Sequence, residues 1–298
     1  LYRGKAPDFQ LLGMDRYFQW LQQKETQKAK GYWENLVGDY QRRVELPSSY
    51  PRLADRVPHS QSETVVVASP LLNRLQAWCD HNRVTLNALV QTVWGTILSA
   101  ETGQRDVVIG ATVSGREAAI DGIGSIAGML INTLPVRLMF DADQPISVLV
   151  KKTGQQFAES LAHGHLSLAD IQALSLARNH LITHTLVFEN YPQDAVTVGW
   201  NWQVVDVFDP MQFDFGLIVA PHTDTLSLRF VFDAKLHTNN RVIALGNRLI
   251  SLLESAIAEA QTSESLRQLA TAEGMPGGWF VTANFTADLM LDTLQLFE

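Results

Sequence analysis

The stretch DVVIGATVSGREAAIDGIGSIAGMLINTLPVRL, residues 106–138, decides how the rest of the chain folds. Two apolar runs, 107–113 and 129–138, flank a segment rich in glycine. The runs are short, contain β-branched residues and are bounded by turn residues, which is typical of buried strands. Repeated glycine between them permits left-handed backbone angles or the close approach of another segment or ligand. The composition alone favours a plain loop between two core strands.

The residues before this stretch alternate between helical and extended patterns. Aromatic residues at helical spacing predict an amphipathic helix over 15–30, and a second short helix follows at 32–36. Residues 46–62 contain three prolines and several serines, which is typical of an extended connector. The N-terminal part therefore resembles a helical arm tied to a larger body.

A strand and two helices are predicted between this connector and residue 106. The strand covers 64–68, and Pro70 suits the first turn of a helix that runs to about residue 81. Thr85 is a plausible N-cap for a longer helix that ends at Gly103 and is apolar on most faces. A helix that is apolar nearly all round is buried between layers, so the order of elements predicts an α/β fold with a sheet covered by helices.

The residues after 138 continue the same architecture. An amphipathic helix is predicted over 145–162, and Ser167 with Asp170 resembles a capping box at the start of a shorter helix. A buried strand is expected at 185–188. Three more strands, in an antiparallel series, are expected at 202–207, 214–220 and 226–232. A long closing helix is expected at 239–261. The tail from 262 predicts a short helix, a linker and the start of a following domain.

Composition and charge exclude several classes of protein. The formal net charge of −8 argues against nonspecific nucleic-acid binding, which needs a basic face. The single Cys79 excludes an internal disulfide and lies in an apolar helix pattern, so we expect a buried, unreactive thiol. No apolar run is long enough to span a bilayer, and the N-terminus lacks the apolar region of a signal peptide. We therefore expect a cytoplasmic protein with neither nucleic acid nor membrane as a partner.

Five segments of the chain resemble the condensation domains of nonribosomal peptide synthetases. The words VIGATVSGRE and GMLINTLPVR match the family's Val-Ser-Gly-Arg loop and the strand after it. HGHLSLADIQ at 163–172 and LVFENYP at 186–192 match two further family segments, and the residues from YFQWLQ to VELP resemble the segment that joins the family's two lobes. Several long matches in the expected order over about residues 1–270 are far more specific than one loop.

The resemblance implies a chloramphenicol-acetyltransferase-like fold, in which two lobes form a V with a tunnel between them. It implies residues 1–61 as inter-lobe helices and connector, 62–261 as the C-terminal lobe, and 262–298 as linker and start of the next domain. In the family, donor and acceptor arrive on the phosphopantetheine arms of carrier proteins, and the acceptor amine attacks the donor thioester. The implied partners are carrier proteins, an N-terminal lobe and neighbouring synthetase modules, with no cofactor bound directly by this chain.

One departure from the family limits this expectation. The catalytic signature has two adjacent histidines, three spacers and Asp-Gly, whereas none of the eight histidines here is adjacent to another. The only Asp-Gly, at 121–122, has no histidine ahead of it. We therefore expect the C-terminal half of a condensation domain, inactive alone. The alternatives are a noncatalytic docking platform and a free-standing acyltransferase, and the missing histidine also counts against the latter.

The resemblance also suggests which residues line the tunnel. The loop residues Ser114, Gly115 and Arg116 lie between the two predicted strands. Arg116 could instead hold the loop by a salt bridge or by hydrogen bonds to backbone, an alternative that the residues themselves favour. Asn132 and Asn190 have two-sided amides that could bond backbone or face the tunnel, and Tyr191 follows a strand end, where amphipathic aromatics often line a cleft.

Other patterns of chemical interest are weaker. His163 and His165 flank a glycine, but nothing supplies the remaining ligands that a metal site requires. The glycines at 122, 124 and 128 miss the dinucleotide fingerprint by one place and precede a strand rather than a helix. No Gly-x-Ser-x-Gly elbow occurs. Three aspartates at 206, 209 and 214 are more typical of a solvated set than of paired catalytic carboxylates.

Overall fold

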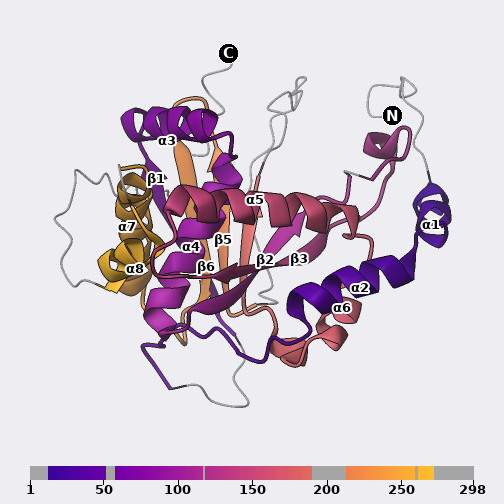
Figure 1. Cartoon of the computed structure of the whole chain (residues 1–298), viewed down its shortest axis with the longest axis horizontal. Helices are drawn as coiled ribbons and strands as arrows, with labels where there is room; N and C mark the ends of the chain where they lie inside the picture. Colours follow the sequence, from indigo (N-terminus) through magenta and orange to yellow (C-terminus); the bar gives the residue numbers. More distant parts are fainter. Residues whose placement is uncertain (1–12, 52–57, 117, 190–212, 259–260, 272–298) are drawn as a thin grey trace.

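The fold is built on one mixed sheet of six strands. The computed structural model describes residues 13–51, 58–116, 118–189, 213–258 and 261–271 (Figure 1). Within them the strand order is β1-β6-β5-β4-β2-β3. β2–β4 and β4–β5 pair in parallel, and the other pairs are antiparallel. The strands are β1 (Ser60–Val67), β2 (Asp106–Val113), β3 (Asn132–Met139), β4 (His184–Phe188), β5 (Phe215–Pro221) and β6 (Leu226–Asp233).

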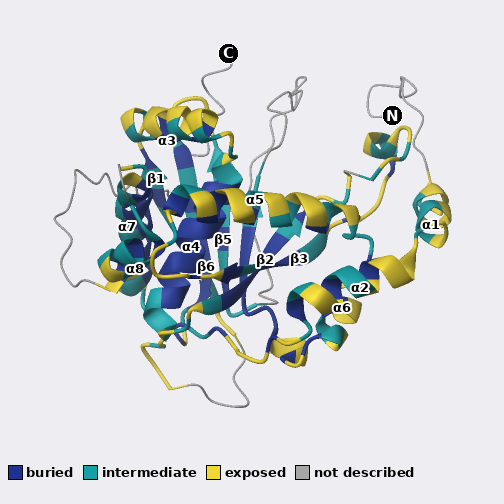
Figure 2. Cartoon of the chain, in the orientation of Figure 1, coloured by how far each residue is buried: buried dark blue, intermediate teal, exposed yellow. Residues whose placement is uncertain are grey.

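Helices cover one face of this sheet along its whole width. α4 (Leu86–Thr102) lies against the strands and is itself overlain by other helices, so most of its residues are buried (Figure 2). Thr85 caps it by accepting a hydrogen bond from Ala88 N at 3.1 Å, and Gly103 ends it in the left-handed conformation. The helices around it are α3 (Ser69–Asn82), α5 (Ile146–Ala162), α7 (Asn239–Ala256) and α8 (Ser263–Thr271). These observations confirm the predicted α/β fold with a helix-covered mixed sheet.

The opposite face of β2 and β3 packs against the N-terminal arm. α2 (Thr26–Val37) and α6 (Leu168–Leu174) contribute a second, smaller core in which Trp33 and Ile171 are fully buried. α1 (Asp15–Gln22) lies beyond α2 and buries no residue fully (Figure 1). The 3₁₀ turns η1 (Ile123–Ser125) and η2 (Arg178–His180) complete the described elements. The edge strand β3 therefore lies between two helical layers.

Several predicted boundaries are wrong. The strand expected at 64–68 is β1, which begins four residues earlier, at Ser60. The expected helix 15–30 is broken at 23–25, because the half-buried face of α1, with Trp20, does not continue into the buried positions Ala29, Trp33 and Val37 of α2. The strand expected from 129 begins at Asn132, since the preceding residues belong to the loop. The closing helix ends at Ala256 and not at 261.

The tail helix predicted from 263 is present and packs into the main core. Leu266 and Ala270 of α8 are fully buried, and Arg267 Nε donates to Ser99 Oγ of α4 at 2.8 Å. The predicted start of a following domain lies in 272–298, outside the described residues. The strand expected at 202–207 also lies outside them, whereas β5 and β6 form the expected antiparallel pair.

The remaining sequence expectations about burial can be checked directly. Cys79 is 4% exposed, which confirms the expected burial, and burial raises the pKa of its thiol to about 12, which disfavours the reactive thiolate. Among the described residues, no helix is both long and apolar enough to cross a membrane.

Candidate functional site

The glycine-rich segment between β2 and β3 folds back on its own ends. Val113 pairs with Asn132 at the last step of the β2–β3 ladder, so the residues between them form a closed loop. Gly115 has φ 71°, and a Cβ there would overlap the carbonyl oxygen of Leu130 across the loop. Only glycine fits this combination of left-handed backbone and close approach. The glycine-rich loop predicted from the sequence is therefore a closed loop whose conformation requires glycine at position 115.

Arg116 holds this loop together. Its guanidinium donates to the carbonyl oxygens of Ile123 at 2.8 Å, Ile126 at 3.3 Å and Gly128 at 3.4 Å. Its backbone N–H also donates to Ser114 Oγ at 3.1 Å. The residue is exposed, although its guanidinium group makes these hydrogen bonds. Of the two roles considered for Arg116, hydrogen bonding to the loop backbone is thus observed.

Asn132 performs the same kind of task at the other end of the loop. Its Nδ2 donates to the carbonyl oxygens of Gly164 and Leu166, each at 2.9 Å. Its Oδ1 accepts from Thr133 N at 2.9 Å. The amide therefore ties the start of β3 to the turn between α5 and α6, which is the backbone-bonding alternative expected from the sequence.

A pocket of about 930 Å³ opens where β2 and β4 end. It is lined by the face of α5 from Lys151 to Leu161 and by the α3–α4 junction, residues 83–87. Ser114 and Arg116 line it beside the closed loop, whereas Gly115 and Asn132 are not among the lining residues. The carboxyl ends of parallel strands are a common place for ligand sites in α/β folds. This pocket is the candidate site.

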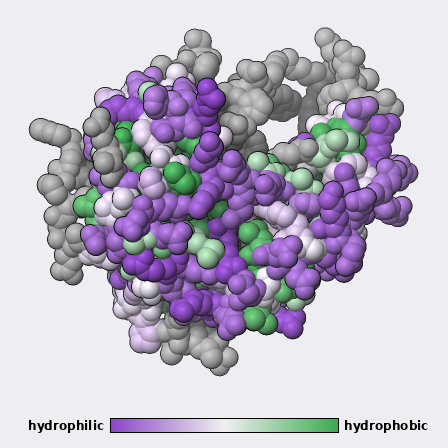
Figure 3. Space-filling model, viewed as in Figure 1, coloured by the Kyte–Doolittle hydropathy of each residue, from purple (hydrophilic) through white to green (hydrophobic). Residues whose placement is uncertain are grey.

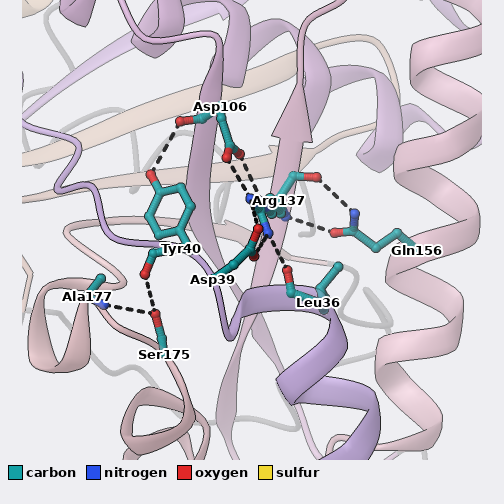
Figure 4. Close-up of polar contacts among 8 residues, drawn as sticks. All are labelled: Leu36, Asp39, Tyr40, Asp106, Arg137, Gln156, Ser175 and Ala177. Carbon is teal, nitrogen blue, oxygen red and sulfur yellow. Dashed lines mark hydrogen bonds and ion pairs between the residues drawn. The ribbon is translucent and has the colours of Figure 1, made fainter.

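Arg137, toward the end of the β2–β3 pair that is opposite to the loop, forms a buried hub that sequence reasoning passed over (Figure 4). Its side chain is 11% exposed and donates to both carboxylate oxygens of Asp106, at 2.9 and 2.7 Å. It also donates to Asp39 at 2.6 Å and to the carbonyl oxygen of Leu36 at 2.9 Å. The hydrogen bond and charge of Arg137 lower the pKa of the Asp39 carboxyl. The signal in the sequence that could have pointed to this hub was a charged residue, Arg137, inside an otherwise apolar predicted strand.

Two neighbouring side chains extend the hub. Gln156 of α5 brackets the backbone of Arg137, accepting from its N–H at 2.8 Å and donating to its carbonyl at 2.9 Å. Tyr40 packs under the guanidinium at 5.4 Å, and its backbone oxygen accepts from Ala177 N and Ser175 Oγ. Burial, followed by the charge of Asp106, raises the pKa of the Tyr40 hydroxyl. The hub thus joins β2, β3, α2 and α5 and supports the strands that carry the loop.

His163 and His165 lie in an aromatic cluster rather than in a metal site. His163 stacks on Tyr32 with ring centroids 4.4 Å apart, and His165 meets Trp20 edge-on at 6.2 Å. Partial burial, helped by the charge of a nearby lysine, lowers the pKa of each imidazole. Among the described residues, no three metal-ligating side chains come together.

The structure leaves part of the predicted site untested. Asn190 and Tyr191 lie outside the described residues, as do Asp206 and Asp209. Asp214 is described and accepts from Arg43 Nη2 at 3.1 Å, an ion pair near the surface.

Comparison with known proteins identifies the class to which this fold belongs. A family model described as Condensation domain matches residues 3–275, so the chain belongs to the condensation-domain family. Bacitracin synthase 3 of Bacillus licheniformis is 32% identical over 260 residues, and tyrocidine synthase 2 of Brevibacillus parabrevis is 29% identical over 283 residues. These matches cover 85% and 88% of this chain but only 4% and 8% of the relatives' own length.

Solved structures give the same fold at low sequence identity. The X-domain from teicoplanin biosynthesis, in a complex with OxyB, superposes with a TM-score of 0.73 at 19% identity, covering 89% of this chain and 63% of that one. The first condensation domain of the calcium-dependent antibiotic synthetase gives 0.70 at 18% identity, covering 89% and 61%. The chloramphenicol-acetyltransferase-like fold implied by the sequence resemblance is confirmed.

Proposed function

We propose that this chain is the C-terminal lobe of a nonribosomal peptide synthetase condensation domain that forms an amide between two carrier-bound substrates. The observation that carries the proposal is the family match over residues 3–275, together with a pocket at the β2 and β4 ends beside the closed loop. Residues 1–61 would be the inter-lobe helices and connector, 62–261 the lobe, and 262–298 the linker and start of a following domain, with α8 at the start of that segment packed on the lobe.

The proposed reaction places this lobe at one side of a tunnel. The acceptor amine attacks the carbonyl of the donor thioester, the new C–N bond forms, the C–S bond breaks, and the amine proton ends on the released thiol. The closed loop with Ser114, Gly115 and Arg116 supplies part of the tunnel wall, and Asn132 positions the strand behind it. Asn190 and Tyr191 remain predicted tunnel residues. Holding both reactants in one tunnel replaces a bimolecular encounter with a positioned one.

The proton-handling histidine would come from an N-terminal lobe. Exposed apolar side chains support an interface near the loop, since Met129 is 83% and Ile131 58% exposed. Figure 3 shows apolar surface where the η1 turn of this loop lies. Contiguous exposed apolar surface marks interaction sites. Carrier proteins would deliver the substrates on their phosphopantetheine arms, neighbouring synthetase modules would flank the lobe, and no cofactor would bind to the lobe directly.

A noncatalytic platform is the second candidate. The observation in its favour is the likeness to the X-domain, which in the solved structure is in complex with OxyB. A platform would use the same fold to recruit carrier proteins or partner enzymes without turnover. Both proposals fit the cytoplasmic location that the sequence predicts.

Reconstitution distinguishes the two functions. We expect the chain alone to give no product above background with matched donor and acceptor carrier proteins. Adding a matched N-terminal lobe that carries the His-His-x-x-x-Asp-Gly signature should restore amide formation, and replacing the second histidine of that lobe should abolish it. Product from the chain alone would contradict the two-lobe proposal. Stable two-lobe assembly that binds both carriers without product would favour the platform.

A further inference from the structure

The helix α1 is held to the rest of the protein far more weakly than α2. Among the residues that the structure describes, no hydrogen bond or ion pair joins α1 to a residue beyond Lys24, and none of its side chains is fully buried. By contrast, α2 has three fully buried side chains, and its Trp33 Nε1 donates to the carbonyl oxygen of His163 at 3.1 Å. Because elements with few buried contacts open locally more readily than the rest of a fold, α1 can leave its place while α2 stays.

The helix α1 touches the lobe at both of its ends. Before its first turn, the side chain of Met14 lies against the backbone of Gly128 in the closed loop, where a Cβ would overlap the Met14 sulfur. Toward its last turn, Trp20 meets the imidazole of His165 edge-on, with ring centroids 6.2 Å apart. Asn132 joins the same loop to the same turn by hydrogen bonds. α1 is therefore a strap that lies across the closed loop and the turn between α5 and α6.

The chain between α1 and α2 has the features of a hinge. Residues 23–25 belong to neither helix and are exposed or half-buried. Glu25, which precedes α2, has φ −74° and ψ 80°, outside the helical region, and its side chain makes no capping hydrogen bond. Residues at the ends of elements absorb the changes in φ and ψ when one element swings. Movement about residues 23–25 would therefore leave the buried face of α2 in place.

The imidazole of His165 is poorly placed for a positive charge while α1 covers it. Its Nε2 is buried and has no hydrogen-bond partner among the described residues, so a proton on this atom would have no acceptor. Burial, followed by the charges of Lys24 and His163, lowers the pKa of His165 below its usual value of about 6.5. A hydrogen bond to the backbone of Ala162 acts in the opposite direction.

The titratable groups around this imidazole come from three elements. Lys24, at the end of α1, has its Nζ 4.2 Å from the centroid of the indole that covers the imidazole. His163 lies in the same turn, and it is affected in its own right by Lys28 of α2 and Glu159 of α5. Tyr17 stacks on the same indole, and burial raises the pKa of its hydroxyl, so it stays neutral. A proton on the imidazole would therefore add a cation beside another cation.

We infer that α1 is a strap that swings away about residues 23–25 when His165 takes up a proton, which uncovers the turn around His165 and the Gly128 side of the closed loop. The protonated imidazole reaches water once α1 has left, so acid favours the open strap. The docked strap is favoured above pH about 6.5 and loses its advantage as the pH falls through the lowered pKa of His165. The inference goes beyond the proposed function and does not depend on it.

Hydrogen exchange of the whole chain at about pH 7.5 and about pH 5.5 tests the inference. Mass spectrometry measures the protection of each segment, corrected for the intrinsic pH dependence of amide exchange. The peptide that covers α1 should lose protection by up to about tenfold at the lower pH, which is one unit below the pKa of a freely exposed imidazole. The peptide that covers α2 is the internal reference and should keep its protection.

Substitutions in the turn identify the responsible histidine. His165→Phe keeps a ring against Trp20 but cannot take up a proton, so α1 should be equally protected at both pH values. His163→Phe is the matched control, because it keeps a ring to stack on Tyr32 and should leave the acid effect in place. Trp20→Ala should leave α1 unprotected at both pH values and so defines the open strap. If His165→Phe does not fold, His165→Gln replaces it, since its amide is neutral at both pH values.

Three results would overturn the inference. The first is equal protection of α1 at the two pH values in the parent chain. The second is an acid effect in His165→Phe as large as in the parent, which would mean that another group titrates. The third is a parallel loss of protection in α1 and α2, which would mean that the whole arm loosens and that residues 23–25 are not the hinge.

Discussion

Arg116 and Arg137 belong to the same 106–138 stretch but have opposite surroundings. Arg116 is exposed and bonds three carbonyls of its own loop. Arg137 is 11% exposed on its side chain and bonds groups from β2 and α2, distant in sequence. One arginine closes a local loop, and the other joins layers of the fold.

The difference shows that the arginine found in a family motif need not be the arginine that contributes most to the stability of the fold. The loop arginine lies in the family's Val-Ser-Gly-Arg segment, yet its bonds constrain only neighbouring residues. The hub arginine has two carboxylate partners and a carbonyl, so its removal leaves several partly buried groups unpaired. Each variant below tests one side of this contrast.

Removing the hub should have the largest effect on stability. Arg137→Ala leaves the Asp106 carboxylate without its bidentate partner and should lower the free energy of unfolding by about 3 kcal/mol. For a chain of this size the melting temperature would fall by roughly 5 °C. Thermal unfolding followed by circular dichroism measures this change.

A surface ion pair provides the control for the hub variant. Arg74 and Glu254 are 2.7 Å apart, with side chains 56% and 53% exposed. Arg74→Ala should therefore cost less than about 1 kcal/mol. Equal destabilisation by Arg74→Ala and Arg137→Ala would mean that burial of the hub contributes nothing.

The closed loop should be most sensitive at Gly115. Gly115→Ala forces a Cβ into left-handed backbone and against the carbonyl of Leu130, which should cost about 1–3 kcal/mol, mainly in the loop. Gly124→Ala is matched, because a Cβ there meets no described atom within 4 Å and its φ is not positive. Limited proteolysis should cut the first variant faster in the loop and leave the second unchanged. Equal cleavage of both would contradict the specific role of Gly115.

The sequence predicted the elements whose signals are local. The strand β2, the Thr85 cap and the end of α4 at Gly103 follow from short-range patterns. The Ser167 cap is also observed, since its hydroxyl accepts from Asp170 N at 3.2 Å. Such features depend on residues a few positions apart, so one sequence is enough to find them.

Features that depend on distant partners were not predictable in the same way. Arg137 meets Asp39 and Asp106 only because α2 crosses β2 and β3, and the sequence does not state that crossing. That Arg83 and Lys151 line the same pocket likewise follows only once the α3–α4 junction and α5 are placed. The break between α1 and α2 depends on which face each helix buries, and hydrophobic periodicity alone continues through it.

Removing the loop arginine should have a smaller and more local effect than removing the hub. Arg116→Ala removes the donor to three neutral carbonyl oxygens that lie near water. We therefore expect the free energy of unfolding to fall by about 1 kcal/mol or less. Hydrogen exchange should quicken in the segment from Ile123 to Gly128, while the strands stay protected. In a reconstituted two-lobe protein, amide formation should slow because the loop wall loosens.

Arg116→Lys separates charge from geometry. A lysine keeps the positive charge but lacks the planar fork that reaches three carbonyls. It should therefore exchange as fast as the alanine variant. Hydrogen exchange like that of the parent in Arg116→Lys would show that charge alone holds the loop. Unchanged exchange in both variants would show that Arg116 does not hold the loop closed.

The smallest effect concerns the exposed partner of the hub and depends on pH. Arg137 lowers the pKa of Asp39 below its unfolded value of about 3.9, so the pair stabilises the fold above that pH and loses its effect as the pH falls through the folded pKa. Asp39 is 76% exposed, so Asp39→Asn should cost less than about 1 kcal/mol at pH 6.

Urea unfolding of the parent and of Asp39→Asn at pH 6 and pH 3 measures this dependence. The difference in free energy should shrink as the pH is lowered from 6 to 3, because pH 3 lies below the unfolded pKa and the carboxyl loses its charge as the pH falls toward its lowered folded-state pKa. In an Arg137→Ala background, Asp39→Asn should have no effect at either pH, because the partner that lowers the pKa is gone. A difference that does not shrink between pH 6 and pH 3, or that survives without Arg137, would show that Asp39 stabilises the fold through other contacts and that the hub reduces to Arg137 and Asp106.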